Sequence, residues 1–367
     1  MKFRANLVGM LMGLSAFSVV GSESGPPFLL DASKLEAAVI SRQLDKALAA
    51  PIVSVTDKPK PSPTGDEHDY VSYRRYWWPD PESSDGLPFI RRDGHSNREQ
   101  VALGDRGELE SFIKNVSVLA AAWHLDQRAD GAKRAGEWLR AWFVDPETRM
   151  NPNLEYAQIC LGHDDDKGSG YGILDARGFT KVIDSIGLLE DSPGLSAQDD
   201  EAIRKWFRDY AHWLITSKNG RAARSAPNNH GTWYRVQVIA ISRFLGDEDL
   251  ARELAQEAHA LLGKQFAKDG SQPHEIARAT GLEYSCFNLE AMFQLATLSA
   301  PLGIDLWNDV APNGASLRLG LDYLRPFNSA PDRWPHRQTK PMKPGFLEPL
   351  MEQGRLGWSA SESSTGE

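Results

Sequence analysis

Residues 228–266 read NNHGTWYRVQVIAISRFLGDEDLARELAQEAHALLGKQF and contain two helical segments. The first runs from Thr232 to Leu245, and the second runs from Ala251 to Phe266. The four residues Gly246-Asp247-Glu248-Asp249 form a short connection between them. Helices joined by so short a connection pack antiparallel. The stretch therefore predicts a helical hairpin.

Segments of the same kind cover most of the chain. Helices are predicted from Leu35 to Ala50, from Tyr284 to Leu298 and from Ser316 to Leu324. Apolar stripes at helical spacing predict three more, over Phe112, Val116, Leu119, Ala120 and Trp123, over Ala135, Trp138, Leu139 and Trp142, and over Ile203, Phe207, Tyr210, Ala211 and Leu214. No convincing run of alternating strands appears. We expect an all-α fold, an (α/α) toroid or barrel of antiparallel helical hairpins, with a helical solenoid as the alternative.

Composition limits the function without naming it. The chain has 367 residues, enough for one large domain or two ordinary ones, and the 41% that are hydrophobic suffice for a packed core. The formal net charge of −9 argues against nucleic-acid binding. It does not exclude an anionic ligand, because the local field in a cleft matters more than the total charge.

The two ends of the chain differ from its middle. Lys2 and Arg4 precede an apolar run from Ala5 to Val20, which is typical of a secretory signal cleaved near Gly21, with a structural helix as the alternative. We therefore expect a signal peptide over residues 1–21, a single toroid domain over 22–345, and a C-terminal tail over 346–367 that is frayed from Gly354 onward. The mature protein is expected to be secreted or periplasmic, monomeric and free of the membrane. Cys160 and Cys286 could form a disulfide or remain as free thiols.

A polar cluster opens the first hairpin. Asn228 suits the N-cap of the helix, which places Asn229 and His230 in its first turn, where backbone N–H groups favour anions. The alternative is a capped helix with a satisfied core histidine.

A second polar cluster, His274-Glu275-Ile276-Ala277-Arg278, follows and leads to Tyr284. Arg278 could bind a carboxylate through two parallel hydrogen bonds, or simply pair with Glu275 on the surface. Tyr284 could act as a base near cationic groups, or be a core aromatic. Together the two clusters suit holding a carboxylate while a proton is removed from the carbon beside it.

Aromatic and basic residues are concentrated between Tyr70 and Pro81. Their flat apolar faces could line a sugar cleft, or anchor a loop in the core. The long glycine-rich interval from Asn151 to Gly178 lies mid-domain, where loops of this length are usually functional. The substrate-binding residues expected from these segments, with the tryptophan next to the first cluster, are Arg74, Arg75, Tyr76, Trp77, Trp78, Tyr156, Gln158 and Trp233.

Metal chemistry has little support in the sequence. The nine histidines form no His-x-x-x-His pair, and the acidic run His163-Asp164-Asp165-Asp166-Lys167 lacks the ligand spacing of a calcium loop. We expect no metal and no cofactor.

Several segments in order resemble the alginate lyase-like polysaccharide lyases. They are residues 70–81, 86–94, 150–158, 175–178, 228–234 and 284–290, so the similarity covers about Asp69 to about Pro335. The resemblance implies an α/α toroid and cleavage of an anionic uronate polysaccharide by β-elimination. It implies that Asn229, His230 and Arg278 neutralise the uronate carboxylate and that Tyr284 transfers the proton.

Stereochemistry narrows the substrate that the resemblance implies. In β-mannuronate and β-glucuronate the C5 hydrogen and the C4 oxygen lie on one ring face, so a single phenol can serve both. We favour polymannuronate, the mannuronate form of alginate, with glucuronan as the alternative. A glycoside hydrolase with two essential carboxylates and a non-catalytic sugar-binding relative are the other classes considered.

Overall fold

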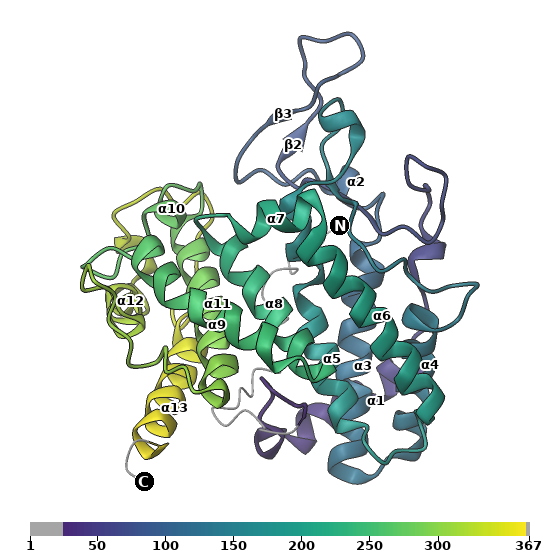
Figure 1. Cartoon of the computed structure of the whole chain (residues 1–367). Helices are drawn as coiled ribbons and strands as arrows, with labels where there is room; N and C mark the ends of the chain where they lie inside the picture. Colours follow the sequence, from purple (N-terminus) through teal and green to yellow (C-terminus); the bar gives the residue numbers. More distant parts are fainter. Residues whose placement is uncertain (1–24, 365–367) are drawn as a thin grey trace.

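The computed structural model describes residues 25–364, so the expected signal peptide lies outside the described residues. Helices dominate and pack side by side (Figure 1). The longer α-helices are α1 (Ala37–Ala49), α3 (Arg106–Asp126), α4 (Ala129–Phe143), α5 (Phe179–Leu188), α6 (Ala197–Thr216), α8 (Asn229–Leu245), α9 (Glu248–Gln265), α11 (Gly281–Ser299), α12 (Leu317–Leu324) and α13 (Glu348–Ser364). Shorter ones are α2 (Arg98–Val101), α7 (Lys218–Arg224) and α10 (Pro273–Ile276).

Helix α8 is central to the packing. It contacts α5, α6, α7, α9 and α11, and nearly all of its residues are buried. Gly246 ends α8 in the left-handed conformation, with φ of 80°, and α9 begins two residues later. The predicted hairpin is thereby confirmed, as is the (α/α) toroid of paired helices.

Within residues 25–364, four short strands that the sequence did not reveal connect loops at one end of the helices. Strand β1 (Val71–Tyr73) pairs in parallel with β4 (Tyr156–Ile159), and β2 (Trp77–Trp78) pairs antiparallel with β3 (Ile90–Arg91). Figure 1 shows β2 and β3 at the same end as α7 and α10. The strands bring the aromatic segment and the glycine-rich interval together, because β1 belongs to the first and β4 to the second.

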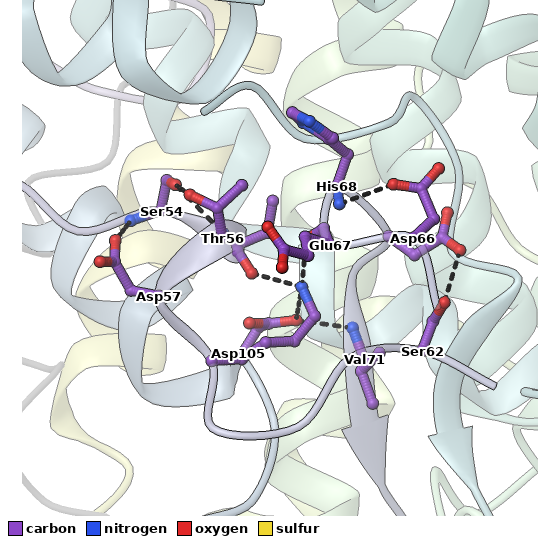
Figure 2. Close-up of polar contacts among 12 residues, drawn as sticks. Ser54, Thr56, Asp57, Ser62, Asp66, Glu67, His68, Val71 and Asp105 are labelled. Carbon is purple, nitrogen blue, oxygen red and sulfur yellow. Dashed lines mark hydrogen bonds and ion pairs between the residues drawn. The ribbon is translucent and has the colours of Figure 1, made fainter. Parts of the chain in front are cut away.

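A buried lysine fastens the loop before β1. Lys58 donates hydrogen bonds to the carbonyls of Val55 and Glu67, and its Nζ lies 3.7 Å from Oδ2 of Asp105. The same carboxylate oxygen accepts the backbone N–H of Val71 at 2.7 Å, as Figure 2 shows. This cluster ties the loop and β1 to the start of α3.

The C-terminal segment differs from expectation. We predicted a frayed tail from its glycines and serines, but residues 348–364 form α13, which packs on α11 and α12. Trp358 is buried there and donates from Nε1 to the carbonyl of Trp307 at 2.7 Å. A Cβ at Gly354 or Gly357 would lie about 2.5 Å from a tryptophan ring. These glycines permit close helix packing rather than marking disorder.

Two further questions from the sequence have structural answers. Cys160 and Cys286 are both free, so the disulfide alternative is not realised. Among residues 25–364, no helix is long and apolar enough to span a membrane.

Candidate active site

The first turn of α8 has the geometry expected from its sequence. Asn228 is the N-cap, and its side-chain oxygen accepts the backbone N–H of His230 at 3.3 Å. Position 231 requires a glycine, because a Cβ there would lie only 2.2 Å from the carbonyl oxygen of Ala226. The cap and the glycine together orient Asn229 and His230 at the start of the helix.

Asn229 is fully buried and is held by a carboxylate that the sequence did not assign to the site. Its backbone N–H and its side-chain Nδ2 donate to Oε1 of Glu275 at 2.8 and 2.9 Å, and Nδ2 also donates to Oε2 at 2.9 Å. Glu275 lies in α10 and is 1% exposed. We had considered Glu275 only as a surface partner for Arg278; it instead joins the two polar clusters.

His230 keeps an unused nitrogen. The residue is 7% exposed, its ring lies edge-on to the ring of Tyr171 at 4.7 Å, and its Nδ1 has no hydrogen-bond partner. Burial, followed by the positive charge of Arg278, lowers the pKa of His230 to about 3. The imidazole is therefore neutral at neutral pH, with a free nitrogen in a buried polar site. The satisfied core histidine considered above does not describe it.

Arg278 and Tyr284 form the second half of the site. The guanidinium donates from Nη2 to the phenol oxygen of Tyr284 at 2.9 Å, and its Cζ lies 3.8 Å from the centre of that ring. On its other side Nη2 donates to Oδ1 of Asp93 at 3.0 Å. Burial opposes ionisation of Asp93, but the hydrogen bonds from Arg278 and from the Ala279 N–H outweigh it, so the pKa of Asp93 falls to about 2. Asp93 is therefore an anion of constant charge, and it holds the guanidinium of Arg278 in place.

The phenol of Tyr284 is protonated in the free protein at neutral pH. Burial raises its pKa, the charge of Arg278 acts in the opposite direction, and a hydrogen bond with Tyr76 raises it further. A phenol in this state can donate a proton at once. It can accept a proton only when it is present as the phenolate, a minor form that the adjacent guanidinium stabilises.

Part of the aromatic segment reaches the site. The guanidinium of Arg74 stacks between the rings of Trp77 and Tyr171, at 5.4 and 5.2 Å from their centres. Lys340 Nζ lies 5.7 Å from the centre of the Tyr76 ring. Tyr171 is 49% exposed and was missed by sequence reasoning. This stack places a cation and open ring faces beside His230.

Three other expected substrate-binding residues, Trp78, Arg75 and Tyr156, make contacts that serve the fold. Trp78 donates to the carbonyl of His95 at 2.9 Å, and the backbone carbonyl of Arg75 accepts from Asn97 at 2.8 Å. Tyr156 packs with Val71 in a small buried cluster. These contacts hold the β2–β3 loop and the β1–β4 pair in place.

Burial changes the predicted role of Trp233, and hydrogen bonding changes the predicted role of Gln158. Trp233 is 3% exposed and packs against Phe287 at 5.2 Å, so it offers no open ring face to a sugar. The side chain of Gln158 donates to Asp175 at 3.0 Å, and Asp175 also accepts from Arg106 at 2.6 Å. Asp175 organises the central interval behind the site, a role that its sequence position did not reveal.

The described residues contain no group of three or more His, Cys, Asp or Glu side chains that could hold a metal ion. The available chemistry is that of a guanidinium, an amide, a neutral imidazole and a phenol. Such a set can stabilise a carboxylate and its enolate-like form while the phenol moves a proton.

Comparison with known proteins agrees with this chemistry. A family model described as alginate lyase matches residues 54–334. The solved structure of an alginate lyase from Bacteroides ovatus is 34% identical, with 88% of each chain covered and a TM-score of 0.82. Comparison with curated proteins gives no match.

More distant structures share the fold. A variant of alginate lyase A1-III in complex with a tetrasaccharide is 16% identical, with 89% of this chain and 88% of the other covered and a TM-score of 0.54. Alginate lyase A1-III from Sphingomonas species A1 is 15% identical, with coverage of 89% and 83% and a TM-score of 0.51. Both likenesses concern the fold alone.

Proposed function

Because the chain belongs to the alginate lyase family and is a polysaccharide lyase, we propose that it cleaves alginate by syn β-elimination and prefers polymannuronate. The observation that carries this proposal is the Arg278–Tyr284 pair, with 2.9 Å between Nη2 and the phenol oxygen, beside the buried Asn229 and His230. The products would be 4,5-unsaturated uronate ends.

Carboxylate neutralisation supplies the larger part of the proposed catalysis. The C5 proton of a uronate is weakly acidic until the negative charge that develops on the carboxyl group is stabilised. Arg278 provides a positive charge, while Asn229 and the neutral His230 provide polar contacts in a buried site, where electrostatic interactions are stronger than in water.

Tyr284 is the proposed proton-transfer residue. Its phenolate removes the C5 proton, the electron pair forms the C4–C5 double bond, and the phenol returns the proton to the departing C4 oxygen. Because burial raises the pKa of Tyr284, the phenolate is a minor form at neutral pH. We therefore expect kcat at saturating substrate to increase with pH on the alkaline side.

The sugar specificity follows from this single-phenol route. Mannuronate and glucuronate present the C5 hydrogen and the C4 oxygen on one face, whereas guluronate presents them on opposite faces. Arg74, Trp77, Tyr171 and Lys340 are the proposed contacts for flanking sugars, since they combine positive charge with aromatic rings. We further propose export of the mature protein, based on the apolar run between Ala5 and Val20.

Initial rates on polymannuronate, polyguluronate, glucuronan and hyaluronan test the proposal. Ultraviolet absorbance of the new double bond should appear with polymannuronate first, and a chelator should leave the rate unchanged. Faster cleavage of glucuronan would change the substrate and keep the mechanism. Preferred cleavage of polyguluronate would contradict the single-phenol route, and saturated products alone would contradict elimination.

A further inference from the structure

The amide of Asn229 faces the wrong way for an anionic ligand. A carboxylate only accepts hydrogen bonds, so Glu275 fixes the amide with its nitrogen toward Oε1 and Oε2, at 2.9 Å from each. The amide oxygen, Oδ1, is buried and has no partner. A sugar carboxylate approaching Asn229 would meet an acceptor where it needs a donor.

Charge presents the same difficulty. Arg278 is the cation beside Tyr284, but Asp93 pairs with it at 3.0 Å and also pairs with Arg91 at 3.2 Å. An ionised Glu275, 1% exposed, adds a second negative charge close by. The two guanidinium groups and the two carboxylates together then carry no net positive charge in a site that must bind an anion, and an anion without such compensation is costly to bury.

One proton on Glu275 removes both difficulties. The neutral carboxyl group can still accept the backbone N–H of Asn229 through one oxygen. Its other oxygen becomes an O–H donor and can bind Oδ1, once the amide has turned over. The unpartnered oxygen is then satisfied, and Nδ2 faces the sugar.

We propose that Glu275 is a positioning residue that takes up a proton from solvent when the anionic sugar binds, which turns the Asn229 amide over to donate to the sugar carboxylate. This inference rests on the proposed function, because it assumes a uronate ligand. It assigns to Glu275 control over which edge of the Asn229 amide faces the substrate.

Among its titratable neighbours, Glu275 is the group whose charge can change when the sugar binds. Burial raises the pKa of Glu275, although the hydrogen bonds from Asn229 and the charge of Arg278 oppose the shift. His230 has a pKa of about 3 and Asp93 one of about 2, so neither changes charge above pH 5. Burial raises the pKa of Tyr284, which therefore stays protonated. A bound anion would raise the pKa of Glu275 further.

Calorimetric binding of a mannuronate tetrasaccharide tests the proposal. The Tyr284→Phe variant slows turnover enough for binding to be measured, and Glu275→Gln in that background imitates the protonated side chain. Proton uptake is obtained by repeating each titration in buffers of different ionisation enthalpy. We expect the single variant to take up close to one proton at alkaline pH, and its Kd to rise by up to about tenfold per pH unit above the pKa of Glu275. The double variant should take up none and show a flat Kd.

Glu290→Gln in the Tyr284→Phe background is the matched control, because Glu290 is a partly buried carboxyl group of raised pKa that accepts from Gln294 instead of Asn229. It should keep the proton uptake. No uptake in the single Tyr284→Phe variant, or equal uptake in the variant that also carries Glu275→Gln, would overturn the proposal even if the substrate is cleaved as expected. A wild-type protein that produces no unsaturated ends from any uronate polymer would instead remove the proposed function itself.

Discussion

Two buried polar regions of this protein differ in how completely their groups are paired. Asp184 in α5 accepts three consecutive backbone N–H groups, from Phe28, Leu29 and Leu30, at 2.7, 3.1 and 2.9 Å. The first turn of α8 leaves Nδ1 of His230 and Oδ1 of Asn229 without partners. Buried polar groups in folded proteins are nearly always hydrogen-bonded. Unpaired buried atoms also occur elsewhere in the described residues, but these two stand on consecutive residues in the site where we propose that a uronate binds.

The difference has a consequence for stability and turnover. Asp184 holds the segment around residues 28–30 against α5, so its hydrogen bonds contribute to the folded state. The unpaired atoms of Asn229 and His230 instead lower the stability of the free folded protein, and a bound ligand would remove this cost by forming hydrogen bonds with them. Substitutions in the first region should affect unfolding, and substitutions in the second should affect catalysis.

The largest effect is expected for Tyr284→Phe, which removes only the phenol hydroxyl. The hydroxyl accepts from Arg278 at 2.9 Å and is the proposed proton carrier. We expect kcat to fall by about 10²–10⁴-fold with little change in binding. Tyr323→Phe, a change at a tyrosine whose hydroxyl contacts His336 instead, is the control. A Tyr284→Phe enzyme with more than about half of the wild-type kcat would exclude this residue from the chemistry.

Asn229→Ala and Asp184→Ala together test the comparison directly. Asn229→Ala, like His230→Ala, should lose about 2–4 kcal/mol of transition-state stabilisation in kcat/KM. Asp184→Ala should instead lower the free energy of unfolding by about 2 kcal/mol, because buried N–H groups lose their acceptor. Its kcat per folded molecule should stay at the wild-type value. If Asn229→Ala merely unfolds the protein and the folded fraction turns over normally, Asn229 is only a helix-capping neighbour.

Acid sensitivity provides a smaller effect of known sign. The folded-state pKa of His230 is about 3, below its ordinary value of 6.5. Between these two pKa values, His230 binds a proton in the unfolded chain but not in the folded protein. The free energy of unfolding therefore falls as the pH drops from about 6.5 toward 3. His230→Gln should remove up to about 2 kcal/mol of the stability difference between pH 6.5 and pH 5. Urea unfolding at the two pH values measures it, and equal differences in both proteins would show that folding does not lower the pKa of His230.

The sequence predicted most of the helices and the residues that carry the site. The helical spacing of apolar residues and the residue types at helix ends are local properties of a sequence. Thr232 to Leu245 was therefore recognised as helical, and Asn228 was identified as its N-cap. The tail was misjudged because Gly354 and Gly357 suggest flexibility in isolation. Gly354 lies beside Trp358 of the same helix, but the contact of Gly357 with Trp307 can only be identified from tertiary packing.

The supporting residues of the site were missed for the same reason. Glu275 stands three residues before Arg278, which suggested a local ion pair, yet its carboxylate contacts Asn229, 46 residues away. Asp93 lies 185 residues from Arg278, and Tyr171 stands in a glycine-rich interval without a distinguishing pattern. Long-range contacts of this kind leave no periodic signal in a single sequence.

The smallest effect separates two tryptophans that the sequence could not distinguish. Trp77 is partly exposed beside Arg74, whereas Trp233 is buried against Phe287. Trp77→Ala should raise KM for polymannuronate about five- to tenfold with little change in kcat, since a stacking and cation–π contact contributes about 1 kcal/mol. Trp233→Phe should leave KM nearly unchanged and lower the melting temperature, because it changes core packing. Initial rates over a range of polymer concentrations, with thermal unfolding of both variants, separate these outcomes. An unchanged KM for Trp77→Ala would place the flanking sugars away from the Arg74 stack and confine recognition to the catalytic groups.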